Sequence, residues 1–479
     1  MNYLSRLLFP RKRLSAAMKP LIAVVGATGT GKSKLAVDLA SRFNGEIING
    51  DAMQMYRGLP IITNQIPVEE RNGIPHHLLS CVELEEEPWR VGLFKKECLR
   101  IIQEIHARGK LPILVGGTHY YTQAVLFNDQ LVGDASDALE ELDDQANGEP
   151  IEPSTRWPVL NAPTEVILQK LREVDPVMAQ RWHPNDGRKI RRSLEIYFQT
   201  GRPASEVYAE QKRLKEGALA RSSSSSDGAG QLRFSTAFFW IHSEKEVLNS
   251  RLDGRVEVMI EQGLLAEAQL MWDYLRDKKS KGITVDQTRG VWVAIGFKEL
   301  APYLEELHKG TASTEELEAL KRTCIESIKT ATRQYSTSQI KWIRNKLWKA
   351  LAAINETSRL YLLDSTHVEN WTGSITEPSE LLVRSLLNGE PTPDPKSLSD
   401  FARTILGEKE AKSREETDPG SETMTCDVCK RTLANNEQWN IHIRGQAHKR
   451  VLKAAVRRAQ REERIAKGIE VPKPAKVVD

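Results

Sequence analysis

The clearest chemical signal in this chain is a phosphate-binding loop with the pattern G-x-x-x-x-G-K-[ST], formed by Gly26, Ala27, Thr28, Gly29, Thr30, Gly31, Lys32 and Ser33. The glycines let backbone N–H groups wrap phosphate oxygens, and a helix that starts at the loop adds its positive end. Lys32 supplies a positive charge, and the Ser33 hydroxyl can bind Mg²⁺. The pattern predicts a phosphate site and allows nucleotide binding, including ATP.

A carboxylate follows the next apolar run. P-loop NTPases usually have an aspartate at the end of a later strand that helps to hold Mg²⁺. The comparable run here, ILVGGTHYY, ends in glycines and Thr118. Asp51 instead follows the run EIING. At that position a carboxylate would lie near the substrate that accepts the transferred group. These features indicate a diphosphate that is not part of a nucleotide, although Asp51 could also cap the next turn.

A second chemical signal lies near the C-terminus. It has the spacing C-x2-C-x12-H-x5-H and consists of Cys426, Cys429, His442 and His448. This spacing is typical of a structural Zn²⁺ site with four protein ligands and no open position for catalysis. Basic residues surround it, which favours phosphate contacts with RNA: Lys430, Arg431, Arg444, Lys449, Arg450, Lys453, Arg457 and Arg458.

The positioning elements follow from hydrophobic patterns. Short apolar runs at 21–25, 46–50, 111–115 and 234–241 predict buried strands, and helical patterns follow the phosphate loop and cover 90–108, 244–276 and 314–348. Alternating strands and helices indicate an α/β fold with a parallel sheet that binds ligands at the carboxyl ends of its strands. The stretch 164–214 has a helical pattern and is basic.

Composition limits the class of protein. Of the 479 residues, 40% are hydrophobic and 28% charged, which is typical of a globular chain, and no apolar stretch is long enough to span a membrane. The five cysteines do not suggest a disulfide framework. The net charge of +3 excludes a nucleic-acid-binding protein whose whole surface is basic. Local clusters of basic residues are still present.

The first 19 residues contain five basic residues and no acidic one, with leucines spaced for a short amphipathic helix. This composition is typical of a mitochondrial transit peptide, although a frayed basic tail fits equally well. Translation from Met18 would omit the leader. We therefore expect mitochondrial and cytoplasmic forms, with the nucleus as a further location.

Several motifs occur in one order along the chain: GATGTGKS, INGDAMQMY, GIPHHLL, VGGTHYY, HPNDGRKIRRSLEIY, GRPAS and GVWVAIGFKE. With these motifs over most of 20–348, the chain resembles the tRNA dimethylallyltransferases (tRNA isopentenyltransferases), and its zinc module is similar to that of the eukaryotic branch. The resemblance implies a P-loop domain with a helical insertion, which together grip the tRNA anticodon stem-loop.

The resemblance also implies a reaction. A dimethylallyl group would pass from dimethylallyl diphosphate to N6 of the adenosine 3′-adjacent to the anticodon, forming N6-isopentenyladenosine and releasing diphosphate. The phosphate loop would bind the diphosphate, with Mg²⁺ at Ser33. The catalytic residues would be Asp51 as the general base, Thr118 at the channel where the substrates meet, and Arg255 on the phosphates.

The residues implied to bind tRNA lie in two motifs, and they are Asp51, Ala52, Met53, Gln54, Arg188, Lys189, Ile190, Arg191 and Arg192. For the basic motif, a merely solvated helix face is the alternative. For the whole chain, the alternatives are a P-loop nucleotide kinase or NTPase with an RNA-binding zinc finger, and an RNA-binding protein without enzyme activity.

The expected organisation has six parts. They are a targeting segment at 1–19, a prenyltransferase core at 20–348 with a tRNA-binding insertion at approximately 134–235, a core extension at 349–390, a linker at 391–422, a zinc finger at 423–452 and a basic tail at 453–479. We expect the protein to act as a monomer.

Overall fold

A computed structural model describes residues 18–128, 157–182, 184, 186–210, 213, 231–416, 424–426, 428–429, 431–433, 436–446 and 448–453. The chain divides into two compact units, Met1–Leu406 and Gly407–Asp479. No helix within the described ranges is both long and apolar enough to cross a membrane.

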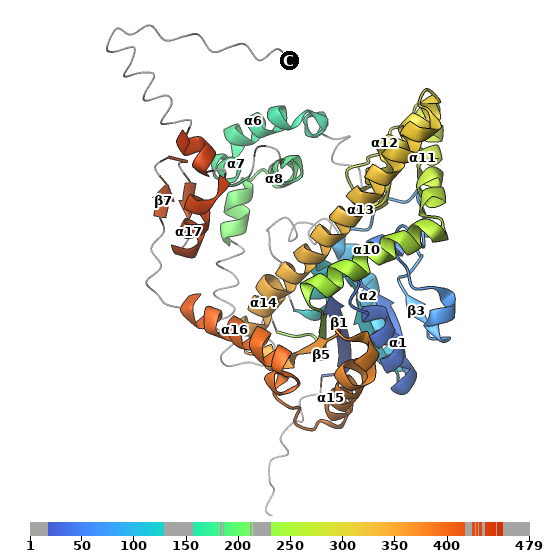
Figure 1. The fold of residues 1–479 in the computed structure, drawn as a ribbon. Helices are drawn as coiled ribbons and strands as arrows, with labels where there is room; N and C mark the ends of the chain where they lie inside the picture. The colour runs from blue at the N-terminus through green and yellow to red at the C-terminus, as the bar shows by residue number, and fades with distance from the viewer. Residues whose placement is uncertain are drawn as a thin grey trace, which may run out of the picture. The chain divides into compact units, whose positions relative to one another are not determined.

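The first unit contains a six-stranded sheet of order β3-β2-β4-β1-β5-β6 (Figure 1), in which every pair of neighbouring strands is parallel. Its strands are β1 (Pro20–Gly26), β2 (Gly45–Asn49), β3 (His76–His77), β4 (Leu111–Val115), β5 (Ser235–His242) and β6 (Leu360–Asp364). The expected parallel α/β fold is therefore confirmed.

Both faces of this sheet are buried. Along β1, Leu21, Ala23 and Val25 enter one hydrophobic cluster, whereas Ile22 and Val24 enter another. This alternation follows from the two-residue period of a strand. One face packs against α1 (Lys32–Arg42) and α15 (Glu377–Asn388), and the other packs against α2 (Val91–Ala107), α3 (His119–Leu126) and α14 (Trp348–Ala353).

Four helices extend from the sheet: α10 (Lys245–Gln262), α11 (Leu264–Ser280), α12 (Phe297–Lys309) and α13 (Thr314–Trp342). The longest, α13, begins at a capping box in which Ser313 accepts from the Glu316 N–H and Glu316 accepts from the Ser313 N–H. It packs beside α12 and crosses α10 on its way to the sheet (Figure 1). The C-terminal end of α13 thereby reaches the carboxyl ends of the strands.

The described part of the expected insertion is helical. It contains α6 (Thr164–Val174), α7 (Pro176–Arg181) and α8 (Gly187–Thr200). These helices share a hydrophobic cluster of their own, and Asp175 caps α7 through the Met178 N–H. Within the expected insertion, residues 134–156, 183, 185, 211–212 and 214–230 lie outside the described residues.

Two segments after residue 348 differ from their expected form. Residues 360–364 form β6, whose short run LYLLD did not suggest a sheet strand but lies buried beside β5. The expected linker at 391–422 contains η10 (Pro395–Ser397) and α16 (Asp400–Glu416). Ala402 and Leu406 of this segment are buried in the main hydrophobic cluster.

The second unit contains a small zinc-finger-like module. Its antiparallel hairpin joins β7 (Met424–Cys426) to β8 (Arg431–Leu433), and α17 (Asn436–Arg444) follows.

Candidate functional site

The phosphate loop connects β1 to α1 at the carboxyl edge of the sheet. Gly29 and Gly31 have φ angles of 86° and 92°, which side chains rarely allow. A side chain at Gly29 would also come within 2.8 Å of the Arg255 guanidinium. Lys32 and the half-buried Ser33 follow as the first residues of α1, so their side chains and backbone N–H groups lie at the helix N-terminus. This is the geometry of a phosphate site.

Arg255 reaches this loop from α10. Its Nη1 donates to Thr28 Oγ1 at 3.0 Å. The nearest acidic residues along the helix are paired elsewhere, Asp253 with Arg333 and Glu257 with Lys329. Arg255 therefore forms an ion pair with neither of these two carboxylates.

The charges of the loop influence one another. Burial lowers the pKa of Lys32 to about 8, while Asp51 opposes this shift and Arg255 adds to it. Burial also lowers the pKa of Arg255. Two partly dehydrated cations at one loop have a strong tendency to acquire an anion, and a diphosphate would supply it.

Asp51 follows β2 and lies within reach of Lys32's charge. Burial raises the pKa of Asp51, although backbone N–H groups of Met53, Gln54 and Gly117 and the charge of Lys32 favour its ionised form. Its Oδ1 accepts from the Met53 N–H at 3.0 Å, so Asp51 does cap the following turn. A buried carboxylate held by backbone donors is also oriented for proton transfer, and the two roles are compatible.

Thr118 lies beside Asp51 because two loops pack closely. A side chain at Gly116 would come within 2.2 Å of the Gly50 backbone, and one at Gly117 would lie 3.0 Å from Asp51 Oδ2. The two glycines in the run VGGT therefore allow the loop after β4 to pack closely against the loop after β2. Thr118 Oγ1 accepts from the Ala52 N–H at 3.0 Å, which joins the loop after β4 to the loop after β2.

The other residues of the Asp51 motif have local partners. Met53 starts a short 3-10 helix, η1 (Met53–Met55). Gln54 Nε2 donates to the Asn64 carbonyl at 2.9 Å, although its side chain stays partly exposed. Ala52, Met53 and Gln54 are all half-buried beside Asp51, so this segment presents several atoms at the site.

The basic motif lies in α8. Lys189 is exposed, with its Nζ 5.0 Å from the Trp182 ring centroid, and Arg192 pairs with Glu195 at 2.9 Å. Arg191 is half-buried on the same helix. Ile190 is fully buried in the cluster of α6–α8, where it holds the helix in place. The side chain of Arg188 lies outside the described atoms.

Three residues of the site have no motif that would reveal them. Gln339, near the end of α13, bridges the phosphate loop and the loop after β4. Tyr335, one turn earlier, hydrogen-bonds Gln339, and burial around its hydroxyl and the charge of Asp51 raise its pKa. Trp371, which follows β6, lies against Gly31: a side chain there would come within 2.5 Å of the indole.

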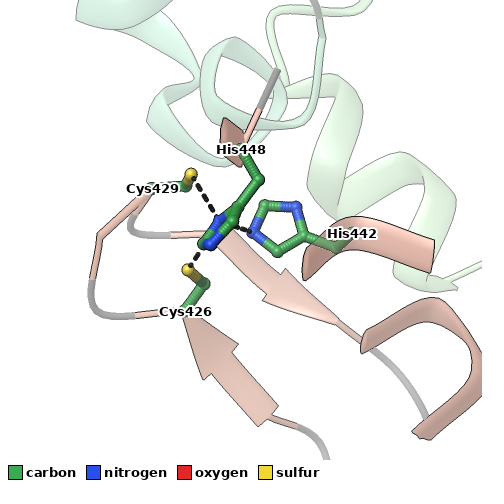
Figure 2. Close-up of side chains that lie close together, drawn as sticks. All are labelled: Cys426, Cys429, His442 and His448. Carbon is green, nitrogen blue, oxygen red and sulfur yellow. Dashed lines mark hydrogen bonds between the residues drawn. The ribbon is translucent and has the colours of Figure 1, made fainter. Parts of the chain in front are cut away.

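The four zinc-finger residues converge in the second unit (Figure 2), with one ligand atom of each within 4.8 Å of the others. His448 Nδ1 lies 3.6 Å from Cys426 Sγ, 3.4 Å from Cys429 Sγ and 3.1 Å from His442 Nε2. Zn–S bonds of about 2.3 Å and Zn–N bonds of about 2.0 Å give tetrahedron edges of about 3.3–3.5 Å between such atoms. The cluster therefore fits a Zn²⁺ ion with no open ligand position.

Exposed basic residues adjoin this cluster. Arg444 ends α17, and Lys449, Arg450 and Lys453 follow His448; all four are exposed. The described part of the unit therefore carries exposed cations next to the four candidate Zn²⁺ ligands. The side chains of Lys430, Arg431, Arg457 and Arg458 lie outside the described atoms.

Comparisons with known proteins agree with this geometry. Residues 54–346 match the family model described as IPP transferase, and residues 424–448 match a zinc finger of C2H2 type. The tRNA dimethylallyltransferase of Schizosaccharomyces pombe is 36% identical and covers 94% of this chain and 98% of its own length. The Homo sapiens tRNA dimethylallyltransferase is 32% identical, covering 91% and 86%. A solved eukaryotic dimethylallyltransferase acting on tRNA has a TM-score of 0.67 and 34% identity, covering 93% of this chain and 99% of its own.

Proposed function

The chain belongs to the IPP transferase family and has tRNA dimethylallyltransferase function, and on this premise we propose that it transfers a dimethylallyl group from dimethylallyl diphosphate to N6 of the adenosine 3′-adjacent to the anticodon. The resemblance identified from the motifs is thereby confirmed. The products are N6-isopentenyladenosine and diphosphate.

One observation supports this chemistry above the others: a dehydrated cationic loop and a buried carboxylate occupy one edge of the sheet. Lys32 and Arg255 lie on the loop side, and Asp51 with Thr118 lies on the other. Asp51 is close enough to Lys32 for each to shift the other's pKa. The cations would stabilise the leaving diphosphate, and the nearby carboxylate would accept a proton from the incoming amine.

The reaction uses these groups as follows. The N6 lone pair forms a bond to C1 of the dimethylallyl group while the bond from C1 to the diphosphate oxygen breaks. Loop N–H groups, Lys32 and Arg255 stabilise the charge that develops on the diphosphate. The proton released by N6 passes to the Asp51 carboxylate, because adenine N6 is a poor nucleophile unless it loses that proton as the bond forms. Thr118, on the Asp51 side, holds the loop after β2 through the Ala52 N–H and orients the acceptor group.

Mg²⁺ fits the donor set at the start of α1. The Ser33 hydroxyl would hold the ion as one oxygen ligand, and the oxygens of a bound diphosphate would be further ligands of the kind that Mg²⁺ prefers. The bound ion would supply further charge neutralisation to the leaving group.

The tRNA anticodon stem-loop is the proposed macromolecular partner. A base that leaves its stack costs a few kcal/mol, which contacts to the surrounding RNA must offset. Lys189, Arg191 and Arg192 on α8, with Ala52, Met53 and Gln54 beside Asp51, are proposed to provide these contacts. The exposed cations of the finger add phosphate contacts. We propose that the protein acts as a monomer, which light scattering at assay concentration would test.

Incubation with dimethylallyl diphosphate labelled in the prenyl group, ATP and bulk tRNA tests the reaction. Label should enter tRNA without ATP hydrolysis, and nuclease digestion should release it as N6-isopentenyladenosine. ATP hydrolysis without label transfer would support the nucleotide kinase or NTPase alternative instead.

A further inference from the structure

Gln339 connects two loops that are far apart in the sequence. Its Oε1 accepts from the Thr28 backbone N–H at 2.8 Å, and its Nε2 donates to the Gly117 carbonyl at 3.0 Å. The side chain is 4% exposed, so both hydrogen bonds are shielded from water. Because one partner is a donor and the other an acceptor, the carboxamide can satisfy both in only one orientation.

The two loops carry opposite sides of the proposed reaction. Thr28 belongs to the phosphate loop, and its hydroxyl oxygen accepts a hydrogen bond from Arg255. Gly117 donates its N–H to Asp51 and directly precedes Thr118. Gln339 thus lies between the group that holds the leaving diphosphate and the group that accepts the proton.

The surroundings leave the carboxamide little freedom. A side chain at Gly117 would come within 2.4 Å of Gln339 Nε2, so the loop and the helix are in close contact. Tyr335 hydrogen-bonds Gln339 from the previous turn. On the next turn, Trp342 stacks on His119 with ring centroids 5.1 Å apart and an interplanar angle of 25°. Contacts from α13 therefore hold both neighbours of Thr118, Gly117 and His119.

We propose that Gln339 is a positioning residue that sets the distance and angle between the diphosphate loop and the loop carrying Thr118, so that the donor carbon and the acceptor nitrogen meet in line. This proposal rests on the roles proposed above for the phosphate loop and Asp51. A displacement of about 1 Å between reacting groups can slow an enzyme about 100-fold, which is the scale on which such a bridge would act.

The replacement Gln339→Met tests the bridge. Methionine has a similar length and volume but leaves the Thr28 N–H and the Gly117 carbonyl without these partners. We expect the single-turnover rate at saturating donor and tRNA to fall about 10- to 100-fold. The tRNA Kd should stay within twofold, because Gln339 is not among the proposed RNA contacts and its hydrogen bonds go to Thr28 and Gly117. A rate unchanged from wild type would overturn the proposal.

Gln334→Met provides the matched control, because Gln334 is exposed on the same helix and the replacement removes the same carboxamide. Its rate should equal that of the wild type. Thermal unfolding of both variants separates a positioning role from a loss of folded protein: the Gln339→Met rate is measured at a temperature at which its melting curve shows it fully folded. An equal loss of rate in both variants would also overturn the proposal.

Gln339→Glu gives a readout that helix packing alone would not produce. A protonated carboxyl has one donor and one acceptor, as the carboxamide does, whereas a carboxylate cannot donate to Gly117. The surrounding titratable and charged groups are Lys32, Asp51, Arg255, His119 and Tyr335. These residues are the same in the variant, and any shift that the new carboxyl causes in their pKa values arises only while it is ionised, so the ratio of the variant rate to the wild-type rate still reports its protonation.

We expect that ratio to rise at least fivefold as the pH is lowered from 8.5 to 6, because protonation restores the bridge. A ratio that stays flat over this range would contradict the bridge. If the wild-type protein itself transferred no prenyl group, the proposed function would fail. If the wild type transferred it and Gln339→Met did so equally well, only the positioning role would fail.

Discussion

Arg255 Nη1 donates a hydrogen bond to Thr28 Oγ1 at 3.0 Å, and this contact joins the middle of α10 to a loop 227 residues earlier in the chain. Arg255 is half-buried, and this burial lowers the pKa of its guanidinium. A buried cation without a nearby anion is costly, so a diphosphate bound at this loop would gain from it. The contact therefore places a cation from α10 at the proposed diphosphate site.

Arg255→Ala should weaken donor binding and slow transfer together. A charge-assisted hydrogen bond contributes about 1.5–3 kcal/mol, so kcat/KM for dimethylallyl diphosphate should fall roughly 10- to 150-fold. Steady-state kinetics at saturating tRNA measure this. The control is Arg276→Ala, an exposed arginine on α11 that should leave kinetics unchanged. Normal kinetics for Arg255→Ala would remove the residue from the diphosphate site.

Asp51→Asn should abolish most transfer while leaving both substrates bound. The amide keeps the size of the side chain and can accept the Met53 N–H, but it cannot take a proton from N6. Loss of a general base typically slows a reaction about 10²- to 10⁴-fold. Single-turnover rates and separate Kd measurements for donor and tRNA distinguish the two effects. Near-normal turnover would leave Asp51 with only its capping role.

The pH dependence of kcat/KM for the donor should have two limbs. Asp51 must be ionised to act as the base, so the rate should rise with pH through a pKa that burial places above the usual carboxyl value. Lys32 must be protonated to bind diphosphate, so the rate should fall as the pH rises through its pKa of about 8. Since arginine stays protonated, Lys32→Arg should lose the alkaline limb. An alkaline limb that persists in this variant would assign it to another group.

Deleting residues 424–479 should weaken tRNA binding and leave the chemical step intact. The exposed basic residues of the finger are proposed to neutralise RNA phosphates, and removing each such ion pair should reduce the slope of log K against log salt by roughly 0.7–0.9. Cys426→Ser should behave like the deletion, because a small zinc module folds only with its metal. The measurements are tRNA affinity across a salt series and turnover at saturating tRNA. Identical salt slopes would mean that the finger serves another partner.

A chain translated from Met18 should be active but lose mitochondrial import. The sheet begins at Pro20 and Met18 is itself exposed, so this shorter form keeps every strand. The proposed targeting role of 1–19 rests on its basic, acid-free composition. Fluorescent fusions of both forms, imaged with a mitochondrial marker, test it. Equal mitochondrial signal from both would contradict a transit peptide.

The local parts of the fold follow from the sequence. The runs that predict β1, β2, β4 and β5 are short, apolar and flanked by turn residues, so burial on both faces is the one environment that suits them. The phosphate loop and the zinc ligands are also local, since each needs a fixed spacing of a few residue types. Their positions follow directly from the motifs.

The long-range parts of the site could not be predicted in the same way. Gln339 lies on a helix that keeps most of its polar residues at least partly exposed, and nothing in its neighbours marks it as buried. Its role depends on a contact with Thr28 that spans 311 residues. β6 and Trp371 lie beyond residue 348, in a segment whose only expected role was to extend the core. Such contacts depend on how elements that are far apart in the sequence pack against one another. The hydrophobic periodicity of a single segment does not show which other segment it will contact.

The position of β6 in the sheet has a consequence for synthesis of the protein. β6 pairs with β5, yet about 120 residues separate them, so ribosomes complete the motifs of the proposed catalytic residues well before β6 emerges. Until then, β5 has one edge with unpaired N–H and C=O groups, which is a template for association with other chains. A message truncated between codons 348 and 360 would therefore encode every catalytic residue named above and still produce a polypeptide prone to aggregation and to disposal by quality control.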